Sequence, residues 1–185
     1  MTSQIKPFAS RLRRYFRAYG GWEAIFRSPL FLLAVSVTAL GYNNWICGDK
    51  WSALSQSLIP NLLGFSLGTY AILFSLMTGR LKRALKAVKN ARDVTFLEEI
   101  NATFFHFIFV QVSALLWAFF YQGTILSDLT QAVEPYWPNA PAAFRFVRAL
   151  GGAVGYTLLV YSISLIVASA LAVYRLALIV DPADE

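Results

Sequence analysis

The sequence predicts an all-α fold, namely an integral membrane bundle of four transmembrane helices with an N-terminal interfacial amphipathic helix. The 185 residues are 57% hydrophobic and only 14% charged, whereas a soluble globular domain carries ~25% charged residues. Four stretches contain no Asp, Glu, Lys or Arg, and each provides the ~20 apolar residues that cross a hydrocarbon core of ~30 Å. These stretches are residues 28–48, 51–79, 100–127 and 149–174.

The stretches account for over half of the chain, so we expect a single membrane domain. Residues 1–27 are predicted to form a cytoplasmic basic amphipathic segment, residues 28–180 the transmembrane domain, and residues 181–185 a cytoplasmic tail. The spans are expected at about 29–47, 53–78, 100–126 and 149–175. The first span is not a cleavable signal peptide, because its basic leader is too long and no small-x-small cleavage site follows it.

Basic residues are concentrated before the first span and between the second and third spans. By the positive-inside rule, both termini and the middle loop are therefore cytoplasmic, and an even number of spans agrees with this. We expect a multi-pass protein of the cell inner (plasma) membrane. The net charge of +6 suits a bilayer with anionic headgroups, so lipid is the expected partner and nucleic acid is not.

The N-terminal segment has apolar residues at helical spacing with arginines between them, which is typical of a helix lying in the membrane interface. These apolar residues are Phe8, Leu12, Tyr15, Phe16 and Tyr19. Gly20 and Gly21 are expected to end this helix. Ser28 and Pro29 then predict the start of the first span, since serine caps helices and proline is tolerated in the first turn.

The second span contains a stripe of small or polar residues at alternating steps of four and three. This stripe, called the polar stripe below, consists of Ser57, Asn61, Gly64, Gly68, Ala71 and Ser75. Small residues let membrane helices approach closely, so the polar stripe predicts packing against the fourth span or a second protomer. The alternative is a water-filled path in a ring of subunits, lined by Ser57, Asn61 and Ser75.

A basic segment follows the second span. Its cations are Arg80, Lys82, Arg83, Lys86, Lys89 and Arg92. They are interpreted as a face that touches solvent or lipid headgroups, or alternatively as a docking surface for a cytosolic protein partner. Thr95 and Glu98 then fit a capping box, which predicts the start of the next helix.

The third span contains the single histidine, His106, with Glu99 seven positions earlier on about the same helical face. One interpretation is a neutral imidazole that is hydrogen-bonded to a neighbouring helix. The other is a modulating, pH-sensing role together with Glu99. The fourth helix is expected to begin near Pro141 and to run to Val180. At that length, either Gly151–Gly152 bends it or its first turns stand outside the bilayer.

Enzyme chemistry is not expected. One histidine and one cysteine, Cys47, cannot supply the usual ligands of a zinc or di-iron site, and no hydrolase, zinc-protease or P-loop motif occurs. We therefore predict no catalytic residues, no metal and no cofactor.

These features predict a small oligomeric channel-like or pore-forming membrane protein, assembled as a homo-oligomer. The alternative is a non-conducting membrane scaffold or sensor subunit that recruits a cytosolic partner through its basic segment. The general form resembles that of small prokaryotic channel-like proteins and of membrane subunits of defence systems. This resemblance is one of architecture and implies no residue roles.

Overall fold

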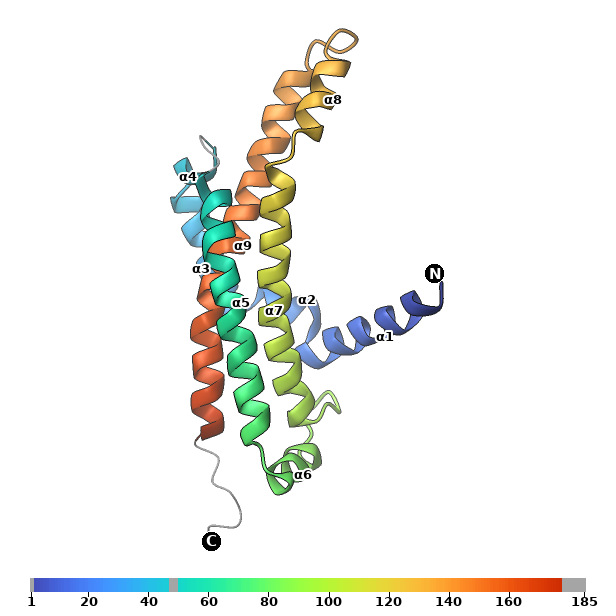
Figure 1. The fold of residues 1–185 in the computed structure, drawn as a ribbon, viewed down its shortest axis with the longest axis vertical. Coiled ribbons are helices and arrows are strands. Elements are labelled where there is room, and N and C mark those ends of the chain that lie inside the picture. Colours follow the sequence, from blue (N-terminus) through green and yellow to red (C-terminus); the bar gives the residue numbers. More distant parts are fainter. Residues whose placement is uncertain (1, 47–49, 178–185) are drawn as a thin grey trace.

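The computed structural model describes residues 2–46 and 50–177, and their regular structure is helical (Figure 1). The helices are α1 (Thr2–Tyr19), α2 (Gly21–Phe26), α3 (Pro29–Leu40), α4 (Asn43–Ile46), α5 (Lys50–Leu76), α6 (Gly79–Ala87), α7 (Phe96–Tyr121), α8 (Ile125–Val133) and α9 (Ala140–Ala177). Among these helices, α5, α7 and α9 are long and apolar enough to cross a membrane. Cys47, residues 178–180 and the predicted tail at 181–185 lie outside the described residues.

The three long helices run side by side, and the shorter helices are arranged around them (Figure 1). Helix α3 packs against α9, and α6 packs against α7 beyond the end of α5. Helix α1 contacts α7 and projects sideways from the bundle. Helix α8 and the first turns of α9 extend past the end of α7 (Figure 1).

The predicted first span is divided into two helices. Helix α3 has 12 residues, a length of ~18 Å at 1.5 Å per residue, so it is shorter than a hydrocarbon core of ~30 Å. The amide of Gly41 donates to the carbonyl of Val37 at the end of α3, and the chain then turns. In α4, the Trp45 indole N–H donates to the carbonyl of Thr38 at 2.9 Å, which holds α4 against the end of α3.

The junction between α1 and α3 partly follows the sequence expectation. Gly20 and Gly21 have φ values of +112° and +71°, a left-handed backbone that glycine adopts without steric cost, and they end α1 as predicted. Pro29 occupies the first turn of α3, also as predicted. Ser28 stands at the N-cap position, but its side chain makes no capping hydrogen bond.

Two helices continue through residues that commonly interrupt helices. Pro60 lies inside α5, so its missing N–H leaves the carbonyl of Gln56 without its usual helical donor. Helix α9 has 38 residues and continues through Gly151–Gly152, which makes it ~57 Å long if straight. The glycine pair therefore does not end the helix, and the extra length appears in the turns that pair with α8 (Figure 1).

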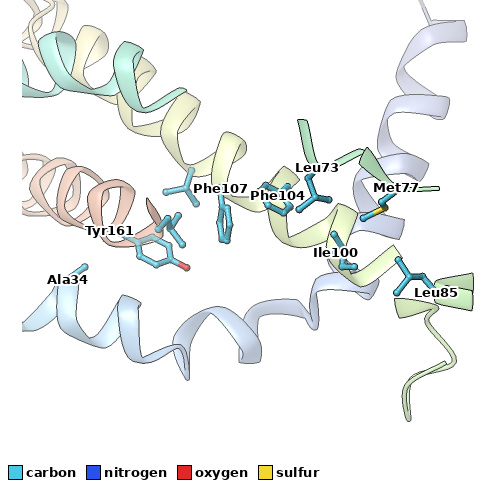
Figure 2. Packing of buried hydrophobic residues seen from close by; sticks show 10 residues of the cluster. Ala34, Leu73, Met77, Leu85, Ile100, Phe104, Phe107 and Tyr161 are labelled. Carbon is cyan, nitrogen blue, oxygen red and sulfur yellow. The ribbon is translucent and has the colours of Figure 1, made fainter. Parts of the chain in front are cut away.

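The described residues form three apolar clusters, two along the bundle and one where α1 packs against α7. Figure 2 shows the cluster nearer α6, in which Leu73 of α5, Phe104 and Phe107 of α7 and Tyr161 of α9 are buried together. The second cluster, nearer α4, is centred on Trp51 of α5. Lipid tails are as apolar as these side chains, so close packing rather than exclusion of water stabilises the contacts within a membrane.

Candidate functional site

The polar stripe lies on the outer face of α5. All six of its residues are exposed, whereas the opposite face of α5 buries Ser52, Ser55, Ile59, Ser66 and Leu73 in the bundle. A Cβ atom added at Gly64 or Gly68 would meet nothing within 4 Å. The prediction that the stripe packs against the fourth span of the same chain is therefore wrong.

The polar groups of the stripe are bonded within their own helix. Ser57 donates to the carbonyl of Leu54 at 3.0 Å, and Ser75 donates to that of Ile72 at 2.8 Å. The Asn61 amide nitrogen donates to the carbonyl of Ser57 at 3.2 Å, which leaves its amide oxygen on the outer face. The stripe thus presents hydroxyls, an amide and bare glycine backbone on the outside of the chain.

The glycines of α9 contact aromatic side chains instead of the stripe. A Cβ atom at Gly155 would overlap the Trp51 ring and lie 2.8 Å from Trp117. At Gly152 it would lie 2.7 Å from the carbonyl oxygen of Trp45, and at Gly151 3.4 Å from the Tyr121 ring. These glycines therefore make room for large rings from α5 and α7 and for the backbone of α4, which explains why α9 needs small residues here.

The buried face of α5 is joined to α7 by polar side chains. The Gln111 amide donates to Ser66 at 3.0 Å, Gln122 donates to Ser52 at 3.1 Å, and Tyr70 donates to Asn101 at 2.8 Å. The Gln111 amide oxygen is buried without a hydrogen-bond partner in the described part of the chain. Ser66 is not part of the polar stripe. The sequence signal that could have identified its contact is one polar residue in each of two neighbouring spans, Ser66 and Gln111.

His106 is held between two tyrosines. Its Nδ1 lies 2.6 Å from the hydroxyl of Tyr15 in α1, and its Nε2 lies 2.9 Å from the hydroxyl of Tyr161 in α9. The ring of Tyr19 stacks on the imidazole at a centroid distance of 4.1 Å. Because His106 is only 2% exposed, its neutral form, with one donor and one acceptor nitrogen, satisfies both contacts.

This arrangement matches the interpretation of a hydrogen-bonded neutral imidazole. Burial raises the pKa of Tyr15 in α1, so this hydroxyl keeps its proton near neutral pH. The sequence does not predict the tyrosine partners. Tyr161 lies 55 positions from His106, and Tyr15 and Tyr19 lie on a helix that the sequence assigns to the membrane interface. Within the described residues, His106 links α1, α7 and α9.

The Glu99 side chain interacts with the loop that precedes α7. Its carboxylate accepts a hydrogen bond from the Asn90 amide at 3.2 Å and lies 3.7 Å from the Arg92 guanidinium. Glu99 therefore pairs with Arg92. Glu98 pairs with Arg14 of α1, while Lys89 pairs with Asp93 at 2.8 Å.

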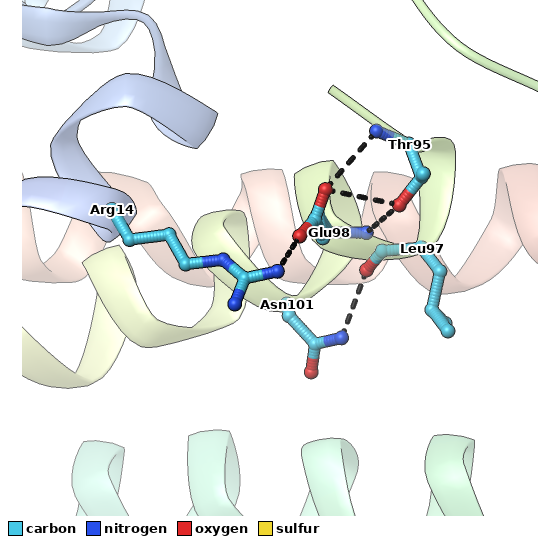
Figure 3. Close-up of polar contacts among 5 residues, drawn as sticks. All are labelled: Arg14, Thr95, Leu97, Glu98 and Asn101. Atoms are coloured by element: carbon cyan, nitrogen blue, oxygen red, sulfur yellow. Dashed lines mark hydrogen bonds and ion pairs between the residues drawn. The ribbon is translucent and has the colours of Figure 1, made fainter. Parts of the chain in front are cut away.

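The capping box at the start of α7 is confirmed and anchors α1. Figure 3 shows that the Thr95 side chain accepts from the Glu98 amide, while the Glu98 carboxylate accepts from the Thr95 amide and from Arg14. The hydrogen bond from Arg14 and that from the Thr95 backbone lower the pKa of Glu98. A single carboxylate therefore caps α7 and binds α1.

The lowered pKa of Glu98 predicts an acid-sensitive contact. A carboxyl with a depressed folded-state pKa stabilises the fold above its ordinary pKa of 4.5, and this contribution is lost as pH falls through the lower folded value. We expect Glu98→Gln to lower the thermal unfolding temperature at neutral pH and to lose less stability than the wild type as the pH falls below 4.5. Circular dichroism in detergent at each pH measures this difference.

The matched control is Glu134→Gln, which neutralises an exposed carboxylate at the C-terminal end of α8. This variant should keep the wild-type dependence on pH. Equal pH profiles for Glu98→Gln and the wild type would contradict the assigned role of Glu98.

The basic segment is divided between a helix and a loop. Helix α6 begins at Gly79 after Thr78, whose side chain accepts from the amide of Leu81 at 3.2 Å, so α6 is separate from α5. The side chains of Arg80, Arg83 and Lys86 are exposed, and Lys82 is half-buried. Lys89 and Arg92 lie in the loop and are bound to acidic residues, so the outward charge of the segment is concentrated on α6.

The described residues contain no group of three His, Cys, Asp or Glu side chains that could hold a metal ion. The candidate sites are the polar stripe of α5, the buried His106 between α1, α7 and α9, and the basic helix α6. No family model matches the chain, and comparison with curated proteins and with solved structures found no match.

Proposed function

We propose that this chain is a small channel-like membrane protein that assembles as a homo-oligomer, with the polar stripe of α5 facing the axis of the assembly. The observation that supports this is the exposure of all six stripe residues on the outside of the three-helix core. A second copy of the chain, or water, would offer the polar groups of this stripe hydrogen-bonding partners that lipid tails lack.

The environment of Asn61 gives the physical reason. A polar amide is unfavourable in hydrocarbon unless it has a hydrogen-bonding partner, and its amide oxygen has none from its own helix. In a ring of copies, Ser57, Asn61 and Ser75 would line a narrow path, and the open space beside Gly64 and Gly68 would let neighbouring helices approach. Packing between copies and lining of a path are then compatible uses of one face.

The proposed topology has four crossings with both termini in the cytoplasm of the inner membrane. Helices α5, α7 and α9 provide three of them. The first crossing would consist of α3 with α2 and α4 at its ends, where Trp22 and Trp45 suit the two interfaces. Local thinning of the bilayer would accommodate the short α3. Helix α1, with its arginines, would lie in the cytoplasmic interface.

The decisive experiment replaces Asn61 with leucine. We expect Asn61→Leu to lower ion flux through protein-containing liposomes about tenfold or more, because an apolar ring favours dewetting of a narrow path. Native mass spectrometry of the same preparation should show an unchanged oligomer. Ser36→Leu is the matched control, since it removes an exposed hydroxyl that is bonded within its own helix on α3, and it should conduct as the wild type does.

A monomeric particle, or equal flux in Asn61→Leu and the wild type, would refute the pore.

The second candidate is a non-conducting scaffold or sensor, and the concentration of exposed cations on α6 favours it. A scaffold predicts wild-type liposomes without flux, and a cytosolic partner whose binding is lost when Lys82 and Lys86 are replaced by glutamine.

A further inference from the structure

Two clefts adjoin α1 where it contacts α7. One has a volume of about 470 Å³ and is lined by Arg13, Arg14 and Arg17 of α1 and by Asp93 and Glu98. Both carboxylates are already engaged. Asp93 pairs with Lys89, and Glu98 pairs with Arg14, as Figure 3 shows. The cleft therefore retains positive charge that its own acidic residues do not neutralise.

This charge belongs to Arg13 and Arg17. Neither guanidinium has a carboxylate partner among residues 2–46 and 50–177. They stand four positions apart, so they are neighbours on one face of α1, and Ser10 adds a hydroxyl to the same cleft. Guanidinium groups bind phosphate oxygens through paired hydrogen bonds, which makes a phosphate-bearing anion the ligand that suits this cleft.

The second cleft has a volume of about 490 Å³ and is largely apolar. Leu12 and Tyr15 of α1, Tyr70 of α5 and Phe105 of α7 line it. It shares Arg14, Ala18 and Glu98 with the basic cleft, so the two clefts meet along α1. A ligand that fits both needs a phosphate at one end and a hydrocarbon chain at the other.

We propose that the junction of α1 and α7 binds one anionic phospholipid. Its phosphate lies between Arg13 and Arg17, and one acyl chain lies against Leu12, Tyr15 and Phe105. A zwitterionic headgroup fits less well, because two unpaired guanidinium groups leave a net positive charge at the site. The site includes none of the polar-stripe residues of α5, so it is independent of whether the stripe lines a pore.

Native mass spectrometry of the detergent-solubilised protein with added phosphatidylglycerol tests the proposal. We expect one lipid to be retained at low lipid concentration, and phosphatidylcholine to be retained at least about tenfold less well. Arg13→Gln/Arg17→Gln should lower retention of phosphatidylglycerol to the level of phosphatidylcholine, whereas Arg13→Lys/Arg17→Lys should keep part of it. The matched control, Arg80→Gln/Arg83→Gln, removes the same charge from α6 and should retain the lipid.

Two further measurements separate a lipid from a soluble phosphate compound. Phe105→Ala alters an exposed ring of the apolar cleft and should weaken retention of phosphatidylglycerol. Inorganic phosphate at millimolar concentration should not displace the lipid. Full displacement by inorganic phosphate would mean that a free anion is the ligand. Unchanged lipid binding in Phe105→Ala would mean that the acyl chain does not lie against this ring. Either result would overturn the proposal. Equal lipid loss in the two Arg→Gln variants would overturn it as well.

Discussion

Gly155→Ala should destabilise the chain severely, because the new methyl group has no space. An added Cβ atom at position 155 overlaps the ring of Trp51 and lies 2.8 Å from Trp117. Trp51 is only 2% exposed and its ring centroid is 4.8 Å from that of Tyr121, so the indole cannot simply swing away. Overpacking of this kind costs about 1–3 kcal/mol, which thermal unfolding in detergent would report as a lower midpoint.

The control for Gly155→Ala is Gly79→Ala in the first turn of α6, where an added Cβ atom meets nothing within 4 Å. This variant should unfold at or slightly above the wild-type temperature, since alanine favours helix more than glycine does. Trp51→Leu in the Gly155→Ala background should recover part of the lost stability, and the double-mutant cycle measures this coupling. Independent, additive effects would show that the two positions do not touch.

His106→Phe should release α1 from the bundle. Phenylalanine keeps a ring against Tyr19 but removes the hydrogen bonds to Tyr15 at 2.6 Å and to Tyr161 at 2.9 Å. Only the bond to Tyr15 reaches α1. At about 0.5–1.5 kcal/mol for that bond, and more where the buried hydroxyl is left unpaired, the opening of α1 becomes roughly two- to 13-fold more frequent. Trypsin cleavage at the arginines of α1 measures this opening.

The control for His106→Phe is Ser113→Ala on the same helix, since the Ser113 hydroxyl bonds only to the carbonyl of Phe109. This variant should be cleaved at the wild-type rate. Tyr15→Phe removes the same bond from the α1 side and should give about the same rate as His106→Phe. If His106→Phe and the wild type are cleaved equally fast, then His106 does not hold α1 in place.

The local features of the fold could be predicted from the sequence because each depends on residues close together in the chain. The capping box of Thr95 and Glu98 follows from a side chain reaching the backbone three positions away. The end of α1 follows from glycines that adopt positive φ. The three long helices follow from long uncharged stretches. The division of residues 29–47 escaped prediction, since it depends on Gly41 and on a contact from Trp45 back to Thr38.

The candidate site could be predicted only as a set of residues that share a helical face. The spacing of Ser57, Asn61 and Gly64 places them on one face of α5 whatever the neighbours are. In a soluble helix, the apolar face would then identify the side that packs on the core. In a membrane helix, the lipid-facing and core-facing sides are both apolar, so this signal is absent and the expected contact with α9 was wrong.

The sequence by itself determined the helices, their caps, the grouping of charge and the membership of the polar stripe, since these depend on spacing along one chain segment. Only the tertiary structure decided how each helix is rotated about its axis. That rotation places the stripe outside, sets Gly155 against Trp51 and brings Tyr15 and Tyr161 to His106. The physical reason is that rotation is decided by the fit of large and small side chains between helices distant in sequence.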